Sequence, residues 1–329
     1  MGNVAPTRWL LAQLYKTQSK PVQAFGLTFK NPVGLAAGYD KDGIAIRGLY
    51  ALGFGHIEIG TVTPKPQAGN PRPRVFRLID DEAVINRMGF PSEGAEYVSR
   101  RMPRRLFRAP RNDTIIGINL GKNKDTPLAE AARDYIELMK VFAPLADYLT
   151  INISSPNTIG LRRLQGRDML EGLLGAIQKE RETALTASTG SARRPNPSPI
   201  GTGGFIPILV KISPDMNENE MDDAIGVMLD HGMDGIIAAN TTLSREGVES
   251  KYRGEAGGLS GSPLAAGSEA VLRRVVKRVD GRVPILSVGG IMSPDDAKKR
   301  LALGASLVQV YTGLVYGGPG LVKRIVEGL

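Results

Sequence analysis

The chain has 329 residues, of which 42% are hydrophobic and 23% are charged, a balance typical of a globular protein that buries a large core. It contains no cysteine, which excludes disulfides, thiolate nucleophiles and protein-bound iron–sulfur clusters, so any redox chemistry must come from a bound cofactor. Two histidines, His56 and His231, leave little material for a histidine metal site or a catalytic triad, and we expect both to be packed or surface residues.

Positive charge is the other compositional feature. The formal net charge is +9, and six arginines fall between Arg100 and Arg111. This cluster indicates either a solvated helix face and loop or a surface for a polyanion or an anionic membrane. Aromatic residues make up only 5% of the chain, which is little for a base-stacking platform, so nucleic-acid binding is not expected. No apolar run approaches the ~18–20 residues of a transmembrane helix and no signal peptide is evident, so a cytoplasmic location is expected.

The first 20 residues are expected to form a short helical extension before a domain at 21–329. Within the extension, Thr7–Thr17 has helical spacing, with Trp9, Leu10 and Leu14 on one side. That side could cap the floor of the following domain or face a membrane, and the spacing alone favours neither.

Eight short apolar runs follow, with helical segments between them. Such runs are typical of parallel strands that are covered on both faces. Eight strand–helix repeats predict a (β/α)8 TIM barrel. The predicted strands are Pro32–Gly38, His56–Thr63, Thr114–Leu120, Tyr148–Ile153, Pro207–Ile212, Gly235–Ala239, Pro284–Val288 and Leu307–Tyr311.

The predicted helices and one insertion lie between these runs. Ser293 and Pro294 are a capped helix start with proline at the first position. Residues 183–205 are rich in Ser, Thr, Gly and Pro and are expected to form a flexible insertion before the fifth strand. The predicted helices are Ala129–Phe142, Met221–Asp230, Ser268–Val279 and Pro294–Leu303.

In such a barrel the chemistry sits at the carboxyl ends of the strands, and the residues there include almost no carboxylates. Glycoside hydrolysis and a divalent-metal site are therefore not expected. Amides, hydroxyls and two lysines predominate, a set that suits a flat, polar, partly anionic heterocycle. Gly289-Gly290 after strand seven and Tyr311-Thr312-Gly313 after strand eight stand where barrels commonly bind phosphate. Flavin mononucleotide (FMN) satisfies both patterns, and Lys211 either neutralises charge on the reduced ring or turns outward.

A family resemblance rests on ten stretches in chain order, among them "NISSPNT" at 152–158. Together they resemble the class 2, quinone-dependent dihydroorotate dehydrogenases from about residue 22 to the C-terminus. The stretches are at 26–43, 57–78, 84–90, 117–124, 152–158, 210–215, 239–242, 257–264, 287–291 and 308–314.

The resemblance implies an FMN-containing barrel that oxidises dihydroorotate to orotate in pyrimidine synthesis, passes electrons to a membrane quinone and lies peripherally on the inner face of the cell membrane. The family has two N-terminal helices at the quinone site, whereas about 20 residues here leave room for roughly one. The implied flavin contacts are Ala36, Ala37, Gly38, Lys41, Thr61, Asn119, Asn152, Lys211, Ala239, Gly261, Gly290, Tyr311 and Thr312. The implied substrate contacts are Lys41, Asn86, Arg87, Met88, Gly89, Phe90, Asn152, Asn157, Asn240 and Thr241.

By the same resemblance the catalytic base is Ser155, with Lys41 in the site and Thr158 and Phe90 beside its proton path. Serine is a poor base in water, so this role requires a site that excludes water and donors that stabilise developing charge. Without the resemblance, Ser155 is an ordinary turn hydroxyl before Pro156. Two rivals remain. A flavin enzyme acting on a pyrimidine in RNA would use the positive charge, but dihydrouridine synthases rely on a cysteine that this chain lacks, and a non-enzymatic basic scaffold would use the arginine cluster.

Overall fold

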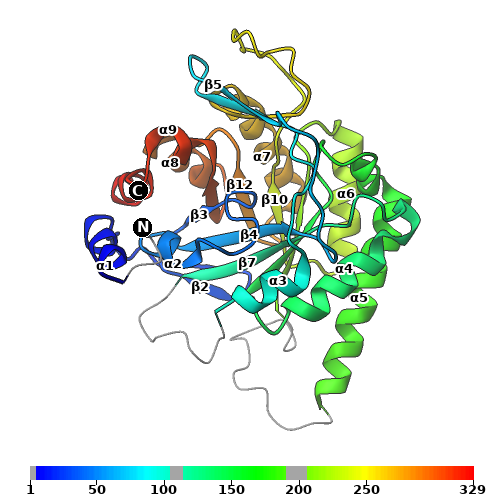
Figure 1. The fold of residues 1–329 in the computed structure, drawn as a ribbon. Helices are drawn as coiled ribbons and strands as arrows, with labels where there is room; N and C mark the ends of the chain where they lie inside the picture. Colours follow the sequence, from blue (N-terminus) through cyan, green and yellow to red (C-terminus); the bar gives the residue numbers. More distant parts are fainter. Residues whose placement is uncertain (1–4, 104–113, 190–205) are drawn as a thin grey trace.

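The computed structural model describes residues 5–103, 114–189 and 206–329. Eight parallel strands close into a barrel with helices around it, which confirms the predicted TIM architecture (Figure 1). Each predicted apolar run contains one barrel strand. Around the barrel the order is β3 (Val33–Leu35), β4 (His56–Val62), β7 (Ile115–Leu120), β8 (Tyr148–Asn152), β9 (Ile208–Lys211), β10 (Gly235–Ala238), β12 (Ile285–Val288) and β13 (Leu307–Val310).

The helices that follow the strands cover the outside of the barrel. The predicted cap is present, because Ser293 and Asp296 form a reciprocal capping box with Pro294 in the first turn. The α-helices are α1 (Ala5–Leu14), α2 (Ile46–Tyr50), α3 (Gly94–Arg101), α4 (Ala131–Phe142), α5 (Arg167–Thr189), α6 (Glu218–Asp230), α7 (Ala265–Val279), α8 (Pro294–Ala302), α9 (Thr312–Gly317) and α10 (Leu321–Gly328). Short 3-10 turns are η2 (Leu128–Glu130), η3 (Leu161–Gln165) and η4 (Ser262–Leu264).

Large rings and small residues fill the lower half of the barrel interior. The hairpin of β1 (Val22–Ala24) and β2 (Leu27–Phe29) contributes Phe29, whose ring stands edge-on to His56 at 5.4 Å between centroids. A Cβ on Gly34 would lie 2.0 Å from the His56 ring, so only glycine fits beside it. Burial lowers the pKa of His56 to about 3, so this residue is a neutral packing group.

A second sheet, which the analysis of the sequence did not foresee, stands beside the barrel. It consists of β5 (Val75–Leu78), β6 (Ala83–Asn86) and β11 (Gly258–Gly261), with β6 in the centre. In Figure 1, β5 projects beyond the barrel body. The sheet encloses a small core of its own, including Leu78, Ile85 and Leu259. Tyr316 on α9 ties it to the barrel, because its hydroxyl donates to the carbonyls of Leu78 at 3.0 Å and Ala83 at 2.9 Å.

The N-terminal helix lies beside the C-terminal helix, not beneath the barrel (Figure 1). Lys323 Nζ donates to the carbonyl of Leu14 at 3.3 Å. Trp9, Leu10 and Leu14 are 65%, 53% and 55% exposed, so the alternative in which this side caps the floor is wrong. The β1–β2 hairpin packs against the inward-facing core instead.

Two other expectations fall partly outside the described residues. The predicted insertion at 183–205 is a helix at its start, because α5 runs to Thr189, and 190–205 are not described. In the Arg100–Arg111 cluster, Arg100 pairs with Glu96 and Arg101 stacks on Tyr97, while 104–111 are not described. Within the described part of the chain, no helix combines the length and apolar character needed to cross a bilayer.

Candidate active site

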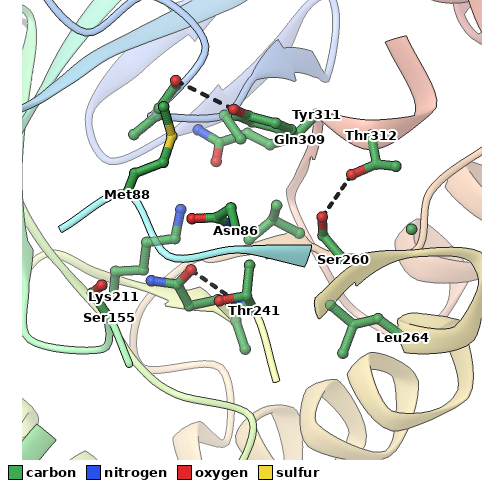
Figure 2. A pocket seen from close by; sticks show the side chains of 18 of the residues that line it. Asn86, Met88, Ser155, Lys211, Thr241, Ser260, Leu264, Gln309, Tyr311 and Thr312 are labelled. Carbon is green, nitrogen blue, oxygen red and sulfur yellow. Dashed lines mark hydrogen bonds between the residues drawn. The ribbon is translucent and has the colours of Figure 1, made fainter. Parts of the chain in front are cut away.

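A cavity of about 910 Å³, counted to its open mouth, lies at the carboxyl ends of the barrel strands. The second sheet forms part of its wall through β6 and β11 (Figure 2). In the view of Figure 2, Ser155 and Lys211 lie on one side of the cavity, and Ser260 and Thr312 lie on the other. The two sides of the cavity therefore carry different side chains.

Glu58 on β4 organises the centre of the barrel beneath this cavity. Its carboxylate is fully buried and accepts hydrogen bonds from Asn119 Nδ2 at 2.7 Å, Gln309 Nε2 at 3.0 Å and Tyr148 OH at 3.1 Å. These three donors come from three other strands. A buried acceptor with three donors joins the strands more firmly than apolar packing alone would.

The network continues upward from Asn119. The Oδ1 atom of Asn119 accepts from Thr61 Oγ1 at 2.6 Å and from Asn152 Nδ2 at 2.9 Å. Thr61 and Asn152 both line the cavity. Glu58 therefore orients two lining residues indirectly, through the side-chain amide of Asn119. The hydroxyl and amide groups held in this way keep fixed positions at the cavity wall.

Two lysines line the cavity. Lys211 points inward from β9 and is only 4% exposed, so the alternative in which it turns outward is wrong. Burial lowers its pKa, and the nearby Glu58 carboxylate raises it. At Lys41, burial among the cavity walls lowers the pKa to about 8, against the opposing effect of Asp42. Both ammonium groups are therefore destabilised as cations and favour an anionic ligand.

The segment after β8 brings Ser155 to the cavity wall. Ser155 Oγ accepts from the Asn157 N–H at 3.2 Å, so the hydroxyl also stabilises the local turn, as the plainer interpretation held. Ser154 is buried behind the lining, where its hydroxyl donates to Asn152 Oδ1 at 2.9 Å and accepts from Asn240 Nδ2 at 2.8 Å. Only Ser155 of the two serines lines the cavity.

The glycine pair after β12 forms the far end. A Cβ on Gly290 would lie 2.3 Å from the Cα of Ala265, so close backbone packing requires glycine there. Behind the pair, the fully buried Arg300 donates to the carbonyls of Gly289 at 3.0 Å and Ala265 at 2.8 Å. Two further guanidinium nitrogens of Arg300 have no hydrogen-bond partner in the described residues. Its Nε also lies 3.9 Å from Glu269 Oε1, so Arg300 is ion-paired and supports the Gly289 and Ala265 backbone from behind.

Most residues named from the sequence line this one cavity. Those that do are Ala36, Ala37, Gly38, Lys41, Thr61, Asn86, Met88, Gly89, Phe90, Asn152, Ser155, Asn157, Lys211, Ala239, Asn240, Thr241, Gly261, Gly290, Tyr311 and Thr312. Their individual roles stay predictions.

Three named residues do not line the cavity. Asn119 lies one layer below and acts through Thr61 and Asn152. Arg87 was expected to contact the substrate, but it is not in the lining and its guanidinium pairs with Glu255 at 2.6 Å. Thr158 is buried outside the lining, and its hydroxyl has no partner in the described residues.

The sequence reasoning missed Ser260 and Gln309. Ser260 shares a 2.8 Å hydrogen bond with Thr312 at the cavity wall. Gln309 is a polar residue within the apolar run of β13, and Lys211 is a polar residue at the end of the apolar run of β9. A polar residue in a buried strand could therefore have indicated that Gln309 belongs to the site. Its amide oxygen is buried without a partner in the described residues, and the residue lines the cavity.

Comparisons with known proteins show the family of the chain. The family model described as "Dihydroorotate dehydrogenase" matches residues 20–329. The chain belongs to the dihydroorotate dehydrogenase family. It is 48% identical over 326 residues to a protein of Anaeromyxobacter sp. (strain Fw109-5) named dihydroorotate dehydrogenase (quinone), covering 97% of this chain and 84% of the relative. A protein of the same name from Azotobacter vinelandii is 48% identical over 316 residues, covering 96% and 86%.

A solved structure of a dihydroorotate dehydrogenase extends the comparison to the fold. The Eimeria tenella enzyme, crystallised in complex with ferulenol, superposes with a TM-score of 0.87 at 42% identity, covering 98% of this chain and 88% of that one. As a member of this family of quinone-dependent dehydrogenases, the protein is an oxidoreductase.

The Glu58 network yields a stability prediction. Glu58→Met leaves three buried donors without an acceptor, at a cost of roughly 1–3 kcal/mol each. We expect thermal unfolding to begin well below that of the parent. Glu137→Met, at an exposed position on α4, is the matched control and should change little. Equal melting temperatures for the two variants would contradict the role given to Glu58.

Proposed function

We propose that this protein oxidises dihydroorotate to orotate with FMN as cofactor, and that the electrons pass to a membrane quinone. The observation that carries the proposal is the single cavity that holds Lys211 and Ser155 on one side and the glycine pair with Thr312 on the other. Its dimensions and donor set fit a flat heterocycle with an anionic tail. The names of the relatives supply the substrate and the acceptor.

The residues present fit FMN. Gln309, Asn152 and Thr61 place amide and hydroxyl groups along the cavity wall, which suits the polar edge of a flavin ring. Gly290 and Thr312 would hold the phosphate, with the buried Arg300 behind them. Bound flavin would supply the acceptor for a hydride.

The remaining chemistry falls to the chain's own side chains. Oxidation of the substrate's saturated carbon pair requires a base to take one proton, and Ser155 Oγ is the hydroxyl at the cavity wall. Lys41 would hold the substrate carboxylate and stabilise charge as the proton leaves. The amides of Asn86, Asn157 and Asn240 would orient the ring, and Phe90 would exclude water from the serine.

The exposed side of α1 is our proposed contact with the membrane surface. Trp9, Leu10 and Leu14 form an unpaired apolar face on a helix that lies against α10, which carries Lys323 and Arg324. Apolar residues flanked by cations suit the interface of an anionic bilayer. Quinone dissolved in that bilayer would approach the barrel from this side.

The role of the serine is tested by substitution. Ser155→Ala should slow anaerobic reduction of the bound flavin by dihydroorotate about 10²-fold, because the general base is lost. Ser99→Ala, whose hydroxyl donates to the Glu96 carbonyl on the exposed side of α3, is the control and should reduce its flavin at the parent rate. Stopped-flow absorbance measures both, and near-normal reduction in Ser155→Ala would remove the serine from this role.

The charge on Lys41 predicts a pH dependence. Burial lowers its pKa to about 8, so the unliganded cation is present below that pH and is lost above it. Orotate affinity should therefore weaken between pH 7 and 9, by up to about tenfold per pH unit above the pKa. Lys41→Gln should bind more weakly and without this dependence. Parent affinity that is constant over the same range would contradict the assignment.

The membrane contact predicts a separation of the two half-reactions. Trp9→Ser/Leu10→Ser removes two exposed apolar side chains, each worth about 1.5–3 kcal/mol when buried, so reduction of vesicle-bound quinone should fall at least about tenfold. Flavin reduction by dihydroorotate should be unchanged. Gln13→Ser, at an exposed polar position of the same helix, is the control. Full quinone activity in the double variant would exclude this face as the docking site.

A further inference from the structure

Arg162 joins three segments at the rim of the cavity. It lies in η3, directly after the Ser155 segment, and its side chain is 21% exposed. Its Nε donates to the Ser154 carbonyl at 3.0 Å, Nη1 to Asp215 Oδ2 at 2.7 Å and Nη2 to the Thr241 carbonyl at 3.1 Å. The segments that follow β8, β9 and β10 therefore meet on one guanidinium.

Asp215 fixes the direction of that guanidinium. Besides the ion pair with Arg162, its carboxylate accepts from the Leu243 N–H at 2.9 Å and from the Thr242 hydroxyl. Its own N–H donates to Ser213 Oγ at 3.2 Å. The carboxylate is thus tied to both the β9 and the β10 segments and cannot turn without breaking several bonds.

The Ser154 carbonyl matters because of peptide planarity. It lies in the same rigid plane as the Ser155 N–H and is covalently bound to Ser155. A hydrogen bond that orients this carbonyl therefore orients the backbone from which the Ser155 side chain projects. In the same way, the Thr241 carbonyl shares a peptide plane with the Thr242 N–H, and Thr241 itself lines the cavity.

Other bonds fix the far end of the Ser155 segment. Asn157 Nδ2 donates to Asn86 Oδ1 at 3.1 Å, and Asn70 Nδ2 donates to the Asn157 carbonyl at 3.1 Å. Ser155 thus lies between an anchor at Asn157 and an anchor at Ser154. Ser154 is also held by its N–H and hydroxyl, which donate to Asn152 Oδ1, and by Asn240 Nδ2, which donates to its hydroxyl at 2.8 Å. Among these bonds, that of Arg162 is the one made to the Ser154 carbonyl, and its loss would let the Ser154–Ser155 peptide plane rotate.

We propose that Arg162, held by Asp215, is a positioning residue that sets the Ser154–Ser155 peptide relative to the Asn240–Thr242 segment, and so places the Ser155 hydroxyl against the substrate. This inference rests on the proposed role of Ser155 as the base. The planar fork of a guanidinium reaches three acceptors in fixed directions, which a lysine ammonium on its flexible stem does not reproduce. A misplacement of about 1 Å can cost about 10²-fold in rate.

The test separates placement from binding and folding. In Arg162→Met holoenzyme, the limiting rate of anaerobic flavin reduction by dihydroorotate should fall by about 10- to 100-fold. The orotate dissociation constant should change less than about threefold, because Lys41, Asn86 and Asn157 are retained. Arg162→Lys should keep the melting temperature but not recover the rate. Arg167→Met is the matched control, since Arg167 pairs with Asp223 and Glu171 away from the cavity, and its rate should be normal.

Two results would overturn the inference. One is a limiting rate in Arg162→Met within about twofold of the parent, and the other is full recovery of the rate in Arg162→Lys. If Arg162→Met yields no folded holoenzyme, Asp215→Asn decides, because it removes the charge that holds the guanidinium and should lower the rate about three- to tenfold. A normal rate in Asp215→Asn would then exclude the positioning role. Failure of the parent itself to reduce its flavin with dihydroorotate would instead refute the proposed function.

Discussion

The buried carboxylate of Glu58 is the interaction on which the site depends. It accepts three hydrogen bonds from side chains on three other strands, and its influence reaches Thr61 and Asn152 through Asn119. A charge at this depth is tolerated only because its acceptor positions are occupied. The floor of the cavity is consequently set by the barrel itself, and not by the loops that surround its mouth.

The rim is built differently from the floor. Arginines reach across backbone segments and hold carbonyl groups there. Arg162 joins the segments after β8, β9 and β10, and Arg245 donates to the carbonyls of Glu255 at 2.9 Å and Gly257 at 2.7 Å before β11. Because loops lack a ladder of their own, such side-chain to backbone bonds replace the order that the strands provide below. On our proposal, the placement of Ser155 therefore depends on residues that do not line the cavity.

The sequence predicted the eight barrel strands to within two residues at most ends, because strands buried on both faces have continuous apolar runs. In the second sheet, β5 and β6 form a local hairpin that the sequence reasoning overlooked, whereas β6 pairs with β11 across more than half of the chain, a contact with no local signal. Most of the cavity lining came from the motifs that resemble the family. Arg162 and Glu58 were not recognised, since a charged residue in a strand or turn does not reveal its partners until the fold brings them together.

The central claim is that one cavity binds FMN and delivers electrons from dihydroorotate to it. The most direct measurement is an anaerobic titration of the purified, FMN-loaded protein with dihydroorotate, followed by flavin absorbance and by the orotate formed. The account predicts complete bleaching with one orotate formed for each flavin reduced. A protein that cannot be loaded with FMN, or one whose flavin stays oxidised in excess dihydroorotate, would contradict it.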